Sequence, residues 1–442
     1  MISAVLIVKN EEEHLAACLE SLRGVMDEIV VVDTGSSDGT VDITRRYTDR
    51  VLEFAWRDDF AAARNFALEQ ARGEWVLTID ADERVLDPAA ARAALVAFCQ
   101  NDPHIVGLVE ILNITGSGDT AQEVVDETER FFRRDFFRYH GAIHEQLVSR
   151  NGEMATAPTG VRLLHLGYAL DAGQAEAKAA RNIRLLNREA AAHPEDEYVH
   201  YQRGKSYFSI QRYNEAASAL ETALAAIDWR RPARPRGAHG PLARKVLTDL
   251  VTTLAYCYAN TERLADARAL LQEHAEWGHP GTARADFPHA QGYVELMLGN
   301  LQAARAAYEA SLEFGPGQED VRGTGSFASA YHLGLIAEAE GNLVAAWNAY
   351  GQSLAFKPDY LVTLRRMVDL AAERQVAPPA ALLATAERAA FQDVYVDRLR
   401  RYLENAMLAE AGFLAKTAAK LDPILLERCR RVLQEFAGRP ES

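Results

Sequence analysis

Short apolar runs alternate with amphipathic stretches over the first 85 residues. Ile2–Val8, Glu28–Val32 and Trp75–Ile79 are rich in β-branched or aromatic residues, which is typical of buried strands. A weaker run near Val51–Phe54 predicts another strand, and Asp58–Ala71 predicts a helix. A first helix is expected after the opening run, with an apolar face made of Leu15, Cys18, Leu19 and Leu22. This alternation predicts βαβ units and an α/β domain with a parallel sheet covered on both faces.

Beyond about residue 170 the pattern becomes continuously helical, and small residues recur in pairs twelve positions apart. The pairs are Gly204 with Ala216, Ala255 with Ala267, Gly292 with Ala304, and Gly334 with Ala346. Such pairs indicate tetratricopeptide-type units, in which two helices approach too closely for a large side chain. We expect units near residues 197–230, 248–281, 285–318 and 327–360. The predicted domains are an α/β domain at 1–170, helical repeats at 171–359, and capping or extending helices at 360–442.

Polar residues follow the ends of the predicted strands. Asn10 and Asp33 come after the first two strands, and Asp80 and Asp82 come directly after the third long run. Because ligands of open α/β sheets bind at the carboxyl ends of the strands, these four residues should converge on one rim. Carboxylates one residue apart are suitable oxygen ligands for Mg²⁺ or Mn²⁺, with phosphates completing the coordination shell.

Seven ordered segments carry a resemblance to a known family. Four of them, Val5–Glu12, Val31–Thr40, Ala63–Asn65 and Ile79–Asp82, resemble the family 2 glycosyltransferases of GT-A fold, a Rossmann-like nucleotide-diphospho-sugar transferase fold. Three later segments, Arg130–Arg133, Ile143–Leu147 and His165–Tyr168, resemble the branch of that family that carries a tetratricopeptide tail. The two-part layout is similar to that of S-glycosyltransferases that modify bacteriocin peptides.

The resemblance implies metal-dependent, inverting transfer of a hexose or N-acetylhexosamine from a nucleotide-diphosphate sugar, most often a UDP-sugar. It places Asp82 on a divalent Mn²⁺ or Mg²⁺ ion, which acts as a Lewis acid on the leaving diphosphate, and Asp80 beside the ribose and the metal. Asp82 as a helix cap or turn residue is the alternative. His165 is a candidate third metal ligand, since imidazole suits Mn²⁺; otherwise it is a satisfied core histidine.

The resemblance also implies a nucleotide pocket. Asp33 would recognise the base, although it could equally form an Asx-turn with the residues that follow it. Arg64 would lie near the base or the phosphates, unless it is an ordinary solvated arginine. The main chain near Val8 and Asn10 would line the base pocket.

An inverting transfer needs a base that takes the proton of the acceptor. Glu145 is the first candidate, and His144 either orients the same acceptor group or replaces Glu145. Glu127 and Glu129 are the other candidates. Alternatively, Glu145 is a surface ion-pair partner of an arginine, and that arginine would be Arg133 or Arg134. These two and Arg130 are further candidates for holding phosphates.

Composition narrows the class of protein. The 442 residues carry a formal net charge of −15, which argues against general binding to nucleic acid or to an anionic membrane. No run approaches the roughly 18 apolar residues of a membrane span, and the opening apolar run is too short for a signal peptide. We therefore expect a cytoplasmic protein with reduced, mostly buried thiols. The cysteines are Cys18, Cys99, Cys257 and Cys429.

The repeats predict a partner, because a helical solenoid presents a long concave surface. That partner is a peptide, protein or glycan acceptor, or a second copy of the chain in a homodimer. Two other classes of protein stay open. One is an interaction scaffold whose transferase head is catalytically weak. The other is a sugar-phosphate nucleotidyltransferase, which needs a Gly-rich basic phosphate loop that Lys9–Glu12 does not provide.

Overall fold

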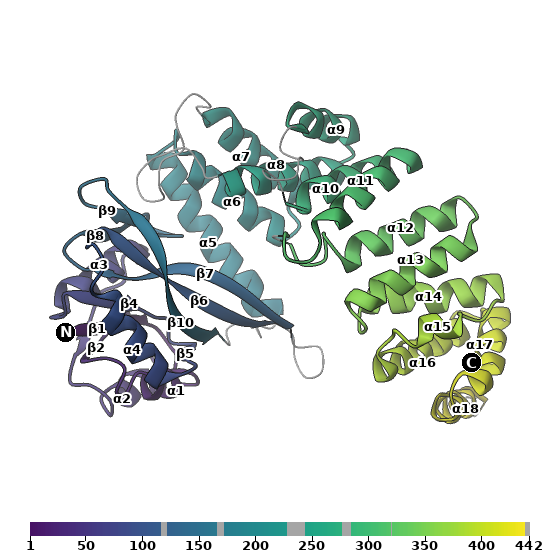
Figure 1. Cartoon of the computed structure of the whole chain (residues 1–442), viewed down its shortest axis with the longest axis horizontal. Coiled ribbons are helices and arrows are strands. Elements are labelled where there is room, and N and C mark those ends of the chain that lie inside the picture. The colour runs from purple at the N-terminus through teal and green to yellow at the C-terminus, as the bar shows by residue number, and fades with distance from the viewer. Residues whose placement is uncertain (116–121, 166–171, 228–243, 276–283, 320, 438–442) are drawn as a thin grey trace. The chain divides into compact units, whose positions relative to one another are not determined.

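A computed structural model describes most of the chain as two compact units, Met1–Leu250 and Val251–Ser442 (Figure 1). Each unit is considered by itself. The described residues are 1–115, 122–165, 172–227, 244–275, 284–319 and 321–437. The inter-repeat insert Arg230–Gly237 and the segment Leu166–Tyr168 of a predicted motif lie outside this set.

The first four strands form the expected parallel part of an eight-stranded sheet. Strand β1 lies between β2 and β4 and is parallel to both, and β3 extends the sheet beyond β2. The predicted apolar face of the first helix is buried, as are most residues of β1. These elements are β1 Ile2–Val8, α1 Leu15–Ser21, β2 Glu28–Asp33, α2 Thr40–Thr44, β3 Val51–Glu53, α3 Phe60–Gln70 and β4 Trp75–Thr78.

The rest of the sheet is mixed, so the parallel arrangement predicted from the first 85 residues extends only as far as β4. Strand β7 is antiparallel to β4 and β6, and β10 is parallel to β6 but antiparallel to β5. Parallel neighbours need crossovers of a dozen or more residues, and the stretch from Thr115 to Gln122 is too short for one. These elements are β5 Glu83–Val85, α4 Pro88–Phe98, β6 Ile105–Thr115, β7 Gln122–Arg133 and β10 Ala155–His165. A small second sheet pairs β8 Phe137–His140 with β9 Gln146–Ser149.

Helices of the first unit pack directly on the α/β domain. Leu185 and Leu186 of α5 form one apolar cluster with Ile143, and Phe60 packs against it. Arg184 of the same helix donates to Asp58 at 2.7 Å, and this contact lowers the pKa of Asp58 to about 2. The helices are α5 Ala172–Ala192, α6 Glu197–Ser209 and α7 Tyr213–Ala226, and α8 Arg244–Ala259 contributes residues to both units.

The predicted small-residue positions lie where paired helices meet. A Cβ added to Gly334 would lie 2.3 Å from the ring of Tyr350, and one added to Gly292 would lie 2.9 Å from the ring of Tyr308. Gly204 lies in the same way against Leu220 in the first unit. The further helices in these pairs are α9 Leu264–Glu273, α10 Asp286–Met297, α11 Leu301–Phe314, α12 Phe327–Ala339 and α13 Leu343–Phe356.

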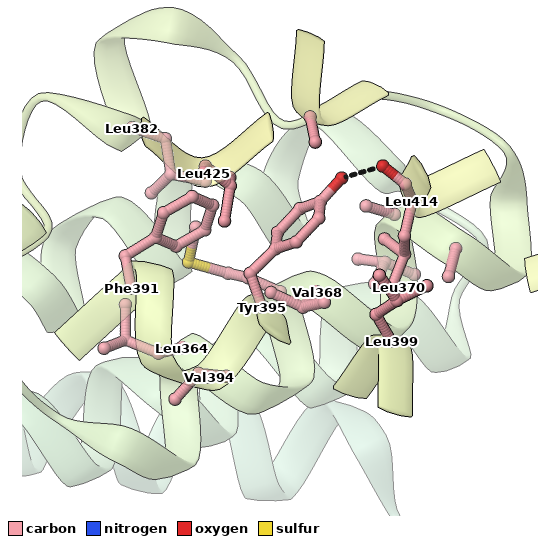
Figure 2. Close-up of a cluster of buried hydrophobic side chains, with 14 of the residues drawn as sticks. Leu364, Val368, Leu370, Leu382, Phe391, Val394, Tyr395, Leu399, Leu414 and Leu425 are labelled. Carbon is pink, nitrogen blue, oxygen red and sulfur yellow. Dashed lines mark hydrogen bonds between the residues drawn. The ribbon is translucent and has the colours of Figure 1, made fainter. Parts of the chain in front are cut away.

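The last helices share a continuous apolar core (Figure 2). The Tyr395 ring lies inside it and its hydroxyl donates to the carbonyl of Leu414 at 2.8 Å, so the polar tip of the tyrosine is satisfied. These helices are α14 Leu361–Arg374, α15 Ala380–Leu383, α16 Arg388–Glu404, α17 Leu408–Leu421 and α18 Pro423–Ala437. The helical half is thus an all-α tetratricopeptide-type solenoid, while the boundaries at 170 and 359 remain predictions.

Two expectations from composition bear on the described residues. All four cysteines are free thiols, and three of them are buried. Among the described helices, none combines the length and the apolar character needed to cross a bilayer.

Candidate active site

The loops after β1 and β2 are tied together at the rim where Val8, Asn10 and Asp33 were expected to meet. The amide of Thr34 donates to the Val8 carbonyl at 2.9 Å, and the Ser37 amide donates to Asn10 Oδ1 at 2.8 Å. Asn10 adopts a left-handed conformation (φ 57°), which asparagine tolerates better than most residues. The prediction that these segments share one rim therefore agrees with their contacts.

Asp33 forms the Asx-turn that its sequence allows. Its carboxylate accepts hydrogen bonds from the amides of Gly35 at 3.0 Å and Ser36 at 3.1 Å. These bonds fix the carboxylate at the carboxyl end of β2, in the middle of the parallel strands. The turn and a role in binding a base are compatible, because each carboxylate oxygen can accept more than one hydrogen bond.

Asp80 lies between two guanidinium groups. Arg64 Nη2 donates to its Oδ1 at 2.9 Å and Arg130 Nη2 to its Oδ2 at 3.0 Å. Burial alone would raise the pKa of Asp80, but Arg130 and Arg64 hold it well below its usual range. Arg130 also binds Glu83 at 3.0 Å, and burial raises the pKa of Glu83. The first carboxylate of the acidic pair is therefore fixed in its charged form.

Asp82 and His165 lie next to each other at the ends of two adjacent strands, β5 and β10, that are far apart in sequence. Strand β10 runs antiparallel to β5 with His165 opposite Glu83, which brings the imidazole next to Asp82. His165 Nε2 lies 3.1 Å from Asp82 Oδ2. The hydrogen bond to Asp82 raises the pKa of His165 against the opposing effect of burial. The structure thus brings together two of the three side chains predicted at the metal, while the third, Asp80, is held by Arg64 and Arg130.

A carboxylate and an imidazole are ligand types that suit Mn²⁺. In the structure Asp82 and His165 contact each other directly, through this 3.1 Å hydrogen bond. Within the part of the chain that the structure describes, no group of three or more acidic, histidine or cysteine side chains is arranged to hold a metal.

Glu11 is a neighbour of this rim to which the sequence assigned no role. Burial, followed by the nearby charges of Asp82, Asp80 and Asp38, raises the pKa of Glu11 to about 7. The accumulation of carboxylates makes the rim attractive to a cation. The sequence signals were its position as the first acidic residue after β1 and its place in the segment Val5–Glu12.

Arg64 connects Glu145 to Asp80 of the acidic pair. The Arg64 Nε donates to Glu145 in a short ion pair, while its Nη2 holds Asp80. The alternative that Glu145 pairs with Arg133 or Arg134 is wrong, because Arg133 pairs with Glu74 and Arg134 with Asp135. Of the three arginines suggested for phosphates, Arg130 alone contacts the acidic pair, through Asp80.

Hydrogen bonds to α3 hold the segment that leads to Glu145, from Tyr139 in β8 to the loop before β9. The Phe60 amide at the start of α3 donates to the Ala142 carbonyl at 2.8 Å. Asn65, next to Arg64, exchanges two 2.8 Å hydrogen bonds with the backbone of Tyr139. His144 is left-handed (φ 52°), an unusual conformation for a histidine that the surrounding contacts must hold.

A cavity of about 370 Å³ opens beside this loop. It brings together Glu145, His144 and Glu129, while Glu127 is exposed and does not line it. The complete lining is Arg64, Thr128, Glu129, Arg130, Tyr139, His144, Glu145, Gln146, Leu147, Tyr198 and Val246.

Comparison with known proteins decides the class of this domain. Residues 3–147 match the sequence model of the family Glycosyl transferase family 2. The N-terminal domain is a family 2 glycosyltransferase domain. The matched segment contains His144, Glu145 and every candidate nucleotide-binding or metal-binding residue except His165.

The names of the relatives refer either to tetratricopeptide repeats or to glycosyltransferase activity. A TPR repeat-containing protein of Synechococcus elongatus is 33% identical over 210 residues, which is 45% of this chain and 50% of the relative. The glycosyltransferase SunS of Bacillus subtilis is 28% identical over 231 residues, covering 50% and 53%. The lipopolysaccharide core biosynthesis glycosyltransferase LpsC of Rhizobium meliloti is 37% identical over 174 residues, covering 37% and 62%. The chain spans about half to three fifths of the length of these relatives.

Proposed function

We propose that this chain transfers a hexose or N-acetylhexosamine from a nucleotide-diphosphate sugar, UDP-linked, to an acceptor. The observation that carries the proposal is the position of Arg64. Its guanidinium binds Asp80 of the acidic pair and Glu145 of the downstream motif. The Arg64 side chain therefore bridges Asp80, the carboxylate expected near the donor, and Glu145, the carboxylate expected near the acceptor. A transfer between two bound substrates requires that both groups lie close together.

The donor would lie along the rim of the parallel strands. Asp33 would accept from the base, with the main chain of Val8 and Asn10 beside it. Asp82 and His165 would hold a divalent cation, Mn²⁺ or Mg²⁺, which supplies Lewis-acid stabilisation to the leaving diphosphate when bound. Asp80, kept charged by its two arginines, would orient the ribose.

Glu145 would act as the general base. It takes the proton of the acceptor as the acceptor oxygen attacks the anomeric carbon, and the nucleoside diphosphate departs from the opposite face, which inverts the configuration. In the structure Glu145 forms an ion pair with Arg64. The Glu145 carboxylate would become available as a base when Arg64 turns toward an incoming diphosphate. His144 lines the same cavity and would orient the acceptor group.

Two classes of acceptor fit the two-part chain. The repeat solenoid suits a peptide or protein held along its concave surface, or a second copy of the chain. A glycan acceptor agrees with the name of the Rhizobium meliloti relative, a lipopolysaccharide core biosynthesis enzyme.

The test is release of UDP from a panel of UDP-hexoses and UDP-N-acetylhexosamines in the presence of Mn²⁺. We expect the wild type to release UDP from at least one donor and Glu145→Gln to be about 10² to 10⁴-fold slower. Glu69→Gln, an exposed substitution on α3, should behave as wild type. UDP release that is equally fast in all three proteins would remove Glu145 from the mechanism, and binding of UDP without any turnover would favour a scaffold.

A further inference from the structure

Part of the lining of the cavity beside Glu145 comes from the helical part of the chain. Tyr198 lies in the first turn of α6 and Val246 in the first turn of α8, and both line the cavity that Glu145 and His144 enter. All of these residues belong to the unit Met1–Leu250. The glycosyltransferase domain alone would leave this side of the cavity open.

We propose that Tyr198 is a specificity-determining residue, and that it forms a stacking wall for a neutral saccharide ring of the acceptor. The inference rests on the proposed transfer reaction and names the acceptor class for that site. It assigns the first helical repeat to substrate recognition at the reacting end of the acceptor.

Tyr198 is held in a fixed relation to the catalytic loop. The carboxylate of Asp196 caps α6 by accepting from the amides of Tyr198 at 3.0 Å and Val199 at 3.1 Å. Val199 packs against the apolar cluster that contains Ile143, the residue immediately before His144. One packed cluster therefore positions both the catalytic loop and the aromatic wall.

The polar tip of Tyr198 is oriented as well. The Gln202 side-chain amide, one turn along α6, donates to the tyrosine hydroxyl at 2.7 Å. The hydroxyl thus accepts from within the helix and keeps its own proton for another acceptor. Aromatic side chains recognise ligands that present an apolar face beside polar groups, and a pyranose ring presents C–H groups on its face and hydroxyls at its edge.

Charge argues against an anionic acceptor. The two guanidinium groups of the lining are both paired: Arg64 binds Asp80 and Glu145, and Arg130 binds Asp80 and Glu83. Glu129 adds another carboxylate to the lining. The diphosphate of a bound donor would bring still more negative charge. A phosphorylated acceptor would meet repulsion here, whereas hydroxyl groups could bind the carboxylates and the Gln146 amide.

The size of the cavity suits a single ring. Its volume of about 370 Å³ lies at the small end of the range of roughly 300 to 1,000 Å³ for ligand pockets. One sugar ring fits in it next to Glu145, and the remainder of a longer glycan would extend outward.

The experiment measures binding of neutral probes and their charged counterparts to the full chain with UDP and Mn²⁺ present. The probes are methyl glycosides of glucose, galactose and N-acetylglucosamine, the 6-phosphates of these glycosides, and a peptide containing serine, threonine and cysteine. Saturation-transfer NMR reports binding, and initial rates with a UDP-sugar donor report KM and kcat. Variants are Tyr198→Ala and Tyr198→Phe, with Tyr207→Ala as a control on the same helix outside the cavity.

We expect at least one neutral glycoside to bind and to accept the sugar. Tyr198→Ala should raise its KM about tenfold, the equivalent of one aromatic stacking contact, while kcat and UDP affinity change less than about twofold. Tyr198→Phe keeps the ring and should stay within about threefold of wild type, and Tyr207→Ala should match wild type.

The inference would be overturned by stronger binding of the 6-phosphates, by binding of the peptide alone, or by an unchanged KM in Tyr198→Ala. If UDP binds and no probe does, the saccharide acceptor is wrong while the donor site stands. If UDP itself fails to bind, the proposed function fails and this inference falls with it.

Discussion

Replacing Gly334 with alanine tests whether the close approach of paired helices defines the solenoid. Gly334 lies on α12 against Tyr350 of the following helix, and an added Cβ would lie 2.3 Å from the ring carbon Cε1 and 2.7 Å from Cδ1. The ring cannot move aside easily, because Tyr350 is fully buried and its hydroxyl donates to Glu338. The methyl group therefore has to push two helices apart.

The size of the effect follows from two opposing contributions. Overpacking of a well-packed core costs about 1 to 3 kcal/mol, while alanine gains roughly 0.5 to 1 kcal/mol over glycine within a helix. The net loss should be about 1 to 2 kcal/mol. For a unit of this size, each kcal/mol lowers the melting temperature by roughly 2 to 4 °C.

Differential scanning calorimetry of the full chain measures this shift in the transition of the Val251–Ser442 unit. Gly412→Ala is the matched control, because Gly412 lies in helix α17 and has no atom within 4 Å of an added Cβ. We expect Gly334→Ala to lower the melting temperature and Gly412→Ala to leave it unchanged or raise it. A rise of the same size in both variants would refute the close approach at Gly334.

Two further predictions concern stability. Burial, followed by the neighbouring His332, lowers the pKa of His289 from 6.5 to about 3, so the folded chain holds this histidine neutral. The unfolded state takes up the extra proton below pH 6.5, so the stability that His289 provides is complete above that pH and is lost as the pH falls toward 3. Between pH 7.5 and 5 this loss amounts to about 2 kcal/mol. Denaturant titrations at pH 7.5 and 5 measure the change in the free energy of unfolding. This change should be about 2 kcal/mol smaller in His289→Asn than in the wild type, and the same as wild type in the exposed control His193→Asn. Removing the α6 cap with Asp196→Ala should cost about 1 kcal/mol in the Met1–Leu250 unit. In the same calorimetric scan, Asp196→Asn should restore most of the loss, and equal losses in both would contradict the capping role.

The sequence was most informative where a local pattern determines a local structure. The four parallel strands are short apolar runs separated by amphipathic helices, and their polar ends necessarily meet at one sheet edge. The glycine–alanine pairs likewise reported a helix contact, because only small residues fit there, as Gly292 beside Tyr308 shows. Both patterns can be recognised from a short stretch of sequence, without any knowledge of the rest of the chain.

Contacts between distant segments could not be derived in this way. The antiparallel pairing of β10 with β5 brings His165 to Asp82, and no spacing in the sequence reports it. The resemblance to family 2 glycosyltransferases supplied that pair. The same limit explains why Glu145 was compared with nearby arginines in the sequence, whereas its partner Arg64 comes from a helix that precedes it by 81 positions.

The wall formed by Tyr198 was missed for a further reason. The sequence predicts a boundary between the α/β domain and the repeats at residue 170, so it gives residues beyond that point no part in the site. The packing of Val199 against Ile143 joins the two parts within one compact unit. A functional residue that lies across a predicted boundary becomes visible only when the packing is known.

The most direct test of the central claim is a calorimetric titration with UDP, with and without Mn²⁺, on the wild type, Asp82→Ala and Glu69→Gln. The account predicts UDP binding that depends on Mn²⁺ in the wild type and in the exposed control Glu69→Gln, and that is lost in Asp82→Ala. Binding of UDP that is equal with and without Mn²⁺ in all three proteins would contradict the metal site. No binding of UDP in the wild type would contradict the donor site itself.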